Sequence, residues 1–272
     1  MPLSVPKASL DHLNAAPLKV AVAQVRYSPV HAVARRDLVA EFESKLDTRY
    51  VARAPQTPQA LTIQFGGGPS PGIVMPSPGL LATQPQVDTV WPFRDEERGY
   101  SVSLGNSALA VEADATYHDF PQFLKELETA VEALVSIFKP KRELRLGVRY
   151  INEIRDTRLR RDIRTVINSE LVLPVGTAVQ GGLLQSFSEL RIAEALGTFV
   201  VRHGLVEEGA TYLLDLDYFS EVEREFDADH VIESVQGLHD LIEAFFVWSL
   251  NPDYLAELSR KRKPRKVGGD AA

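Results

Sequence analysis

A group of arginines on one expected strand is suited to binding an anion. Apolar and charged residues alternate over 143–155, which places Arg145 and Arg149 on the same face of a strand. Guanidinium groups in that arrangement form a fork that fits phosphate or carboxylate. Gln24 and Arg26 occupy the matching place in an earlier strand. The sequence therefore predicts a ligand- or partner-binding surface made of Arg26, Arg145, Arg149, Glu153 and Arg155.

The same arginines also have a purely structural explanation. They could form surface ion pairs, which stabilise a protein only slightly. Tyr150 and Asn152 fall on the opposite, apolar face of the strand. A buried amide has to be hydrogen-bonded, so Asn152 is expected to act as a structural anchor. The carboxylates available for the surface pairs are Glu143, Glu153, Asp156 and Asp162.

Positive charge is concentrated in two segments of an otherwise acidic chain. Residues 139–164 include ten basic and four acidic residues, whereas the whole chain has a net charge of −7. A second basic run follows near the C-terminus, where a solvated tail is the ordinary interpretation. Together the two segments support an alternative function in nucleic-acid binding, because basic side chains neutralise phosphates. The second run consists of Arg260, Lys261, Arg262, Lys263, Arg265 and Lys266.

Patterns for catalysis are weak. A strand near the C-terminal helix carries alternating acidic residues, and paired carboxylates could hold a divalent metal for hydrolysis. That is a further alternative, although a solvated strand face is the expectation. No histidine spacing fits a metal site, no Gly-x-Ser-x-Gly turn occurs, and the glycines at 66–68 lack the ending of a phosphate loop. We predict no catalytic residue, metal ligand or cofactor, and favour a non-enzyme. The acidic residues are Asp215, Asp217, Glu221, Glu223 and Glu225.

Composition narrows the chemistry further. The chain has 272 residues and no cysteine, which excludes disulfides, thiolate metal sites and cysteine nucleophiles. Its first residues do not have the pattern of a secretory signal. No stretch reaches the roughly 18 uninterrupted apolar residues of a membrane-spanning helix. We therefore expect a cytoplasmic protein without a membrane span.

The chain divides into two segments with the same order of elements. In each segment a strand precedes a helix, several antiparallel strands and a long amphipathic helix. Asp119 is a typical N-cap for the first long helix, and a Gly/Pro-rich loop covers 66–86. The helices are expected at 33–46, from residue 119, at 158–171 and at 229–250. The strands are expected at 19–27, 61–65, 87–93, 100–104, 109–113, 143–154, 184–193, 198–206 and 211–219.

Short recurring pieces suggest that the two segments are copies of one unit. Val-Arg-Tyr at 25–27 recurs at 148–150, and Arg-Arg-Asp at 35–37 recurs at 160–162. We predict an α+β fold of two similar halves, each an antiparallel sheet with a long helix packed on one face. The two halves could form one continuous sheet or two sheets that meet at a pseudo-twofold axis. The expected domains are a first repeat at 17–140 and a second at 141–250, with flexible tails at 1–16 and 260–272.

Three motifs also match a known group of proteins. They are a Trp-x-Phe strand at Trp91 and Phe93, Tyr117 before an amphipathic helix, and Arg-Leu-Gly-Val-Arg-Tyr-Ile-Asn at 145–152. In these the chain resembles a sporadically distributed family of uncharacterised bacterial proteins of about this length. The resemblance covers roughly 17–155. The resemblance implies no catalytic residues, and the patchy distribution of the family implies a link to mobile or defence loci.

These observations favour a non-catalytic binding or protein-interaction module. Two like halves would present two similar surfaces with a cleft between them, in which a protein partner or a small molecule could bind. The alternatives are a nucleic-acid-binding protein that uses 139–164 and the basic tail, and a metal-dependent hydrolase that uses the acidic residues of the second half.

Overall fold

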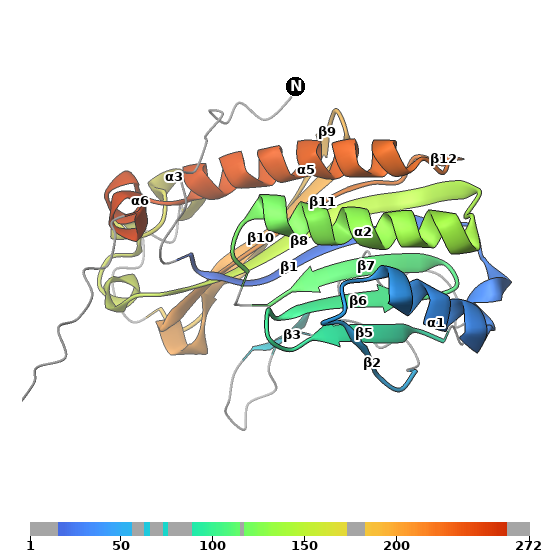
Figure 1. Cartoon of the computed structure of the whole chain (residues 1–272). Coiled ribbons are helices and arrows are strands. Elements are labelled where there is room, and N and C mark those ends of the chain that lie inside the picture. The colour runs from blue at the N-terminus through green and yellow to red at the C-terminus, as the bar shows by residue number, and fades with distance from the viewer. Residues whose placement is uncertain are drawn as a thin grey trace, which may run out of the picture.

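The architecture centres on one large antiparallel sheet. The computed structural model describes residues 16–55, 63–65, 73–75, 89–114, 117–172 and 183–259. Within them, ten strands form a single sheet in which every pair is antiparallel. Two long helices lie side by side on one face of this sheet (Figure 1). The protein therefore has mixed α and β content organised around one sheet.

The first and second segments of the chain contribute neighbouring strands to this sheet. Its order is β2-β5-β6-β7-β1-β8-β11-β10-β9, and β12 pairs with β8. β3 (Ile63–Phe65) and β4 (Ile73–Met75) form a separate two-stranded sheet. The strands of the large sheet are β1 (Leu18–Tyr27), β2 (Val51–Ala52), β5 (Trp91–Asp95), β6 (Tyr100–Leu104), β7 (Ala108–Ala113), β8 (Arg142–Arg155), β9 (Ser188–Glu194), β10 (Gly197–Val206), β11 (Thr211–Ser220) and β12 (Arg224–Glu225).

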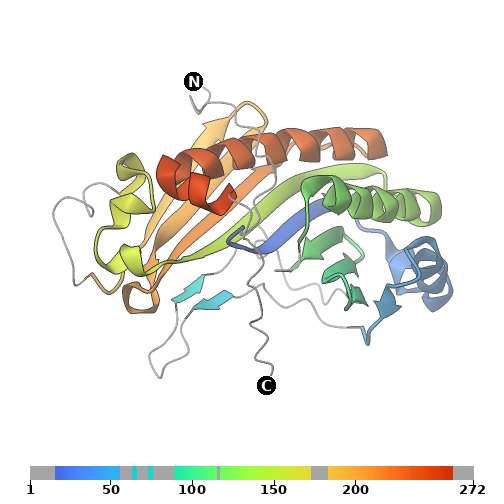
Figure 2. The same ribbon diagram turned by 60° about the vertical axis from the view of Figure 1, so that its left-hand side comes forward.

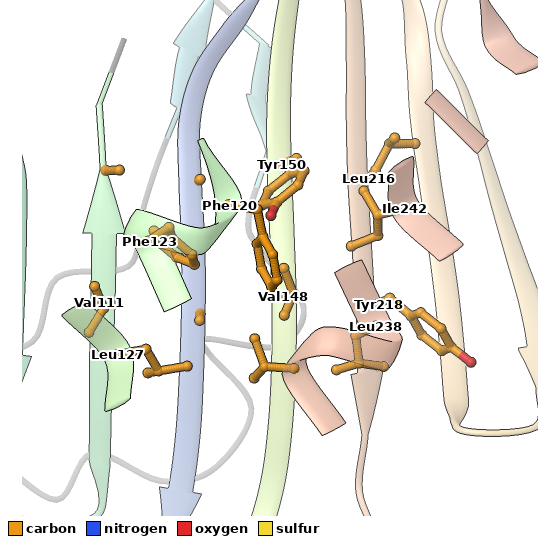
Figure 3. Close-up of a cluster of buried hydrophobic side chains, with 14 of the residues drawn as sticks. Val111, Phe120, Phe123, Leu127, Val148, Tyr150, Leu216, Tyr218, Leu238 and Ile242 are labelled. Carbon is orange, nitrogen blue, oxygen red and sulfur yellow. The ribbon is translucent and has the colours of Figure 1, made fainter. Parts of the chain in front are cut away.

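The two long helices cover the sheet because each has a broad apolar stripe. α2 (Phe120–Phe138) packs on β7, and α5 (Ala228–Ser249) packs on β8 and β11. Phe123 and Leu127 of α2 and Leu238 and Ile242 of α5 point into one continuous core between helices and sheet (Figure 3). The shorter helices are α1 (Arg36–Lys45), α3 (Ser169–Val172) and α6 (Pro252–Ser259), with single turns at His31–Ala34, Thr157–Arg160, Ile163–Thr165 and Glu207–Gly209.

Local sequence signals set the ends of the long helices. The Asp119 side chain accepts a hydrogen bond from the backbone N–H of Gln122, so the expected N-cap of α2 is confirmed. α2 ends where Lys139 adopts a left-handed backbone conformation, just before Pro140. Asp227 caps α5 in the same way as Asp119 caps α2, accepting from the backbone N–H of His230.

The predicted architecture of two sheet-plus-helix halves is wrong. β1 and β8, the first strands of the two expected halves, pair with each other in the centre of one sheet, from Leu18 opposite Asn152 to Tyr27 opposite Glu143. α2 and α5 also contact each other on one face of this sheet (Figure 2). Each of these two strands would otherwise leave a row of unpaired backbone groups at an edge, and joining them satisfies both rows. The residues on either side of Pro140 therefore share one sheet and one core.

The prediction of a charged helix at 158–171 is also wrong. This stretch forms two short turns followed by α3, a four-residue helix. The side chains of Asp156 and Asp162 accept hydrogen bonds from the backbone N–H groups of Arg158 and Arg164, two residues further on. Such aspartate turns compete with the helical hydrogen bonds that charge periodicity alone suggests.

Most other expected elements are confirmed within a few residues. β6 and β7 form the predicted hairpin, and β10 and β11 match the expected strands. β4 lies inside the segment 66–86 that was predicted as a loop, while 66–72 and 76–86 lie outside the described residues. Across the parts of the chain that the structure describes, no helix combines the length and apolar character needed to cross a membrane.

Candidate functional site

Five buried charged side chains gather on the face of the sheet opposite α2 and α5. Arg145 and Arg149 come from β8, Arg202 from β10, and Asp215 and Asp217 from β11, three neighbouring strands. The register places Arg149 opposite Asp217 and Arg202 opposite Asp215. All five residues are at most 6% exposed, and charged residues are almost never so buried unless they are paired. We call these five residues the arginine–aspartate network.

Asp215 holds two of the three arginines in place. Arg149 donates to it twice, from Nε to Oδ1 and from Nη2 to Oδ2, both at 2.8 Å. Arg202 donates from Nη1 to Asp215 Oδ2 at 3.3 Å and from Nε to Glu189 Oε2 at 2.8 Å. A bidentate arginine–carboxylate pair fixes the geometry of both groups. Arg149 and Arg202 are therefore ordered by their carboxylate partners.

Arg145 is positioned by packing instead of by hydrogen bonds. Its Nη2 lies 3.9 Å from Asp217 Oδ1 and its Nε lies 3.9 Å from Glu221 Oε1, beyond the range of a hydrogen bond. The guanidinium Cζ lies 4.3 Å from the centroid of the Phe219 ring, a cation–π arrangement. Gly147 leaves room beneath it, since a Cβ at that position would lie 3.1 Å from Arg145 Nη1.

Each arginine of the network keeps a buried nitrogen with no hydrogen-bond partner among the residues that the structure describes. These atoms are Nε of Arg145, Nη1 of Arg149 and Nη2 of Arg202. Leaving a buried donor unpaired costs about 1–3 kcal/mol, and more for a charged group. Gln24, opposite Gly147 on β1, adds a buried amide whose Oε1 also has no hydrogen-bond partner within the described segments. The face therefore offers several polar groups of mainly donor character.

The pKa of Arg145 and the pKa of Arg149 shift in opposite directions. Burial lowers the pKa of Arg145, and the attraction of Asp217 and Glu221 offsets this only in part. Burial also works against the charge of Arg149, yet its hydrogen bonds to Asp215 leave the pKa above the ordinary value. Burial raises the pKa of Asp217 despite the nearby arginines. Burial therefore works against the charged forms of both Arg145 and Asp217.

The structure separates the residues that were predicted to form one binding surface. Arg26 is half-buried and lies opposite Arg145 on β1, on the same face. Glu153 and Arg155 lie towards the other end of β8, where Arg155 Nη2 is 3.2 Å from Glu153 and 3.4 Å from Glu207. They do not join the network. Arg145 and Arg149 are brought together as predicted, but their expected surface partners are replaced by Asp215 and Asp217.

Sequence reasoning missed three members of the network. Asp215 and Asp217 were expected on a solvated acidic face, and this prediction is wrong because β8 and β10 flank β11 and supply arginines to it. Arg202 was not singled out at all. One signal was available: Asp-Leu-Asp at 215–217 alternates at the same period as the arginines of β8. Using it requires knowing that the two strands are neighbours.

The apolar face of β8 carries a different polar group. Tyr150 Oη lies 2.8 Å from Nδ1 of His239 on α5, and the His239 ring stacks on Phe120 of α2 with centroids 3.6 Å apart. Asn152 donates from Nδ2 to the carbonyl of Leu214 at 3.2 Å. These contacts bind helices and strands together inside the core, which fits a structural role.

The basic segment 139–164 does not form a face of one sign. Arg142 pairs with Glu223 at 3.1 Å, and Arg158 pairs with both Asp156 and Glu257. Arg164 pairs with Asp162. The basic run of the proposed nucleic-acid site, residues 260–266, lies outside the described residues.

The carboxylates suggested for a metal-dependent hydrolase lie against guanidinium groups. Asp215 and Asp217 both approach Arg202, while Glu221 and Glu223 approach Arg145 and Arg142. Among the described residues, no group of three or more His, Cys, Asp or Glu side chains could hold a metal ion.

Neither the family models nor the curated proteins to which the sequence was compared include a match. What the site does must therefore be argued from its side chains.

Proposed function

We propose that this chain is a non-catalytic binding protein that holds an anionic group, a phosphate or carboxylate, on the arginine–aspartate network. The observation that supports this most directly is Arg145, a guanidinium that is 6% exposed and makes no hydrogen bond among the described residues. A cation placed in such surroundings gains more from an anionic partner than one at the surface does, because water no longer screens it.

The unpaired donors of the network, more than its net charge, favour an anion. Its members carry three positive and two negative formal charges, and Glu189, which is bound to Arg202, brings this sum to zero. An anion that accepts from Arg145, Arg149 and Arg202 would satisfy donors that the described part of the chain leaves unpaired. Charge-assisted hydrogen bonds of this kind are among the strongest that proteins make.

Asp217 is the natural competitor of such an anion. Its carboxylate lies 3.9 Å from both Arg145 and Arg202, and it forms only these long contacts with them. Burial raises its pKa, so it is a carboxylate that gives up its charge comparatively easily. Binding of an anion would be helped by protonation or removal of the Asp217 charge.

The geometry favours this proposal over the two alternatives from the sequence. Nucleic-acid binding would need free basic side chains, whereas several of those in 139–164 are paired with carboxylates. Metal-dependent hydrolysis would need carboxylates without cationic partners, whereas Asp215 accepts from two arginines. The family resemblance and its link to bacterial defence loci stay predictions.

Calorimetric titration with inorganic phosphate, at constant ionic strength set by chloride, tests the proposal. We expect the wild-type protein to bind phosphate, and Arg145→Gln to weaken binding about tenfold or more, equivalent to about 1.4 kcal/mol.

Two further variants test the surroundings of Arg145. Asp217→Asn should tighten phosphate binding because one competing negative charge is lost. Gly147→Ala should weaken it because the added Cβ meets the guanidinium. Citrate in place of phosphate shows whether carboxylates are preferred.

Arg142→Gln is the matched control, because Arg142 is on the same strand but pairs with Glu223 at the surface. It should bind like the wild type, and circular dichroism should show that each variant is folded. If neither phosphate nor citrate binds more than chloride does, or if Arg145→Gln binds as well as the wild type, the proposal is wrong and the network only supports the fold.

A further inference from the structure

The two ends of the large sheet are built very differently. At one end β2 has only two residues, Val51 and Ala52, and Arg53 follows directly. A very short edge next to a charge is a common way to prevent further strand pairing. At the other end β9 runs for seven residues and pairs only with β10 among the described strands. The β9 edge is therefore long enough to pair with a further strand, although it carries charged residues of both signs.

The surface around β9 is unusually apolar. The described residues include seven large hydrophobic side chains that are exposed, and four of them lie within 184–196. Their exposed fractions range from 40% to 62%. One of the four lies in β9 and the other three lie just before or after it. Exposed apolar side chains in and beside an edge strand are typical of a surface that another chain covers. The four residues are Leu184, Phe187, Leu190 and Leu196.

The sequence of β9 is complementary to itself in one antiparallel register. If a two-fold axis passes beside Leu190, Glu189 of one copy lies opposite Arg191 of the other, and Arg191 lies opposite Glu189. Leu190 then faces its own counterpart, and Phe187 faces Ala193. A register centred on Glu189 or on Arg191 would instead set like charges opposite each other, which is unfavourable.

We propose that two copies of this chain pair through β9, antiparallel and centred on Leu190, so that one sheet runs through both. The partner is a second copy because, in this register, β9 supplies both the Glu189 and the Arg191 of each charge pair. Such an interface is isologous, as in most homodimers. The inference shares one residue with the arginine–aspartate network, because Glu189 also accepts from Arg202 Nε at 2.8 Å. It does not require that an anion binds to the network.

Sedimentation of the full chain over a range of concentrations provides the first test. We expect a concentration-dependent dimer, and Leu190→Lys should raise its dissociation constant about tenfold or more, because it removes the central apolar contact and brings two like charges together. Val222→Lys is the matched control: Val222 is 57% exposed but lies outside β9, and this variant should dimerise like the wild type.

Disulfide trapping tests the register. Because the chain has no cysteine, a single introduced thiol can react only with its counterpart in another copy. Residues directly opposite each other in an antiparallel pair have Cα atoms about 4.5–5.5 Å apart, within the range that a disulfide spans. Leu190→Cys should therefore form a covalent dimer under mild oxidation, whereas Val222→Cys should not.

Three outcomes would overturn the inference. One is a chain that stays monomeric at high concentration. Another is a dimer that forms while Leu190→Cys is not trapped, because the interface then lies elsewhere. The third is a foreign strand-forming peptide that binds β9 while the chain stays monomeric.

Discussion

Tyr150 and His239 show how a single buried contact makes stability depend on pH. His239 is 9% exposed and shares a hydrogen bond with Tyr150 while its ring lies flat against Phe120. Burial lowers the pKa of His239 from 6.5 to about 4. Between these two pH values the unfolded chain takes up a proton at this position and the folded chain does not. Acidification through that range therefore favours unfolding.

The free energy of unfolding should fall by up to about 3 kcal/mol between pH 6.5 and 4 because of this one residue. His239→Asn removes the titrating ring and keeps a polar group near Tyr150. The expected result is a shallower loss of stability in the variant over this range, measured by urea unfolding at several pH values. Parallel pH curves for the two proteins would show that His239 is not the cause.

The arginines of β8 illustrate what residue patterns can and cannot predict. Strict alternation placed Arg145 and Arg149 on one face, and the structure brings them together. Their partners could not be predicted, because Asp215 and Asp217 lie more than sixty positions further along the chain and meet them only through strand pairing. Local pattern determines the face of a side chain, whereas topology determines its neighbours.

At the scale of single elements, a helix was predicted correctly where a capping residue and an apolar periodicity both indicated it. Asp119 preceded a long apolar stripe, and α2 begins there. Over 158–171 charge periodicity suggested a helix, but Asp156 and Asp162 offered local hydrogen bonds to the backbone, and short turns formed instead. Asp156, just before the predicted helix, and Asp162, inside it, are the sequence signals for these turns.

The cap of α2 can be tested directly. Asp119→Ala removes the acceptor for the backbone N–H of Gln122, and we expect it to lower the free energy of unfolding by about 1 kcal/mol. Asp119→Asn, which retains a capping acceptor, should cost less. The exposed Lys125 on the same helix provides a control, since Lys125→Ala should have little effect. Equal losses from all three variants would mean that the cap is unimportant.

For the whole molecule, the repeated tripeptides led to the wrong architecture. They suggested two similar halves, each with its own long helix on an antiparallel sheet, and left open whether the halves share one sheet. The structure has one sheet, in which β1 pairs with β8, and one core, in which α2 contacts α5. The sequence contains no simple signal for which sheet edges remain free. Which edges remain free depends on how the apolar faces of α2 and α5 are buried in one core, and this is a property of the complete chain.

A single shared core predicts a single cooperative unfolding transition. A fragment that ends at Pro140 would lose the β8 partner of β1 and the α5 partner of α2. We expect residues 1–140 alone to show no cooperative thermal transition, while the full chain unfolds in one step, both followed by circular dichroism. A stable, cooperatively unfolding fragment would contradict this.

The pairing of β1 with β8 also affects how the protein is made. Leu18 finds its place opposite Asn152, so over half of the polypeptide must leave the ribosome before the centre of the sheet can assemble. Contacts that close so long a loop form slowly. During that interval the nascent N-terminal strand exposes one side to other chains, and this period of synthesis is when the protein is most prone to aggregate.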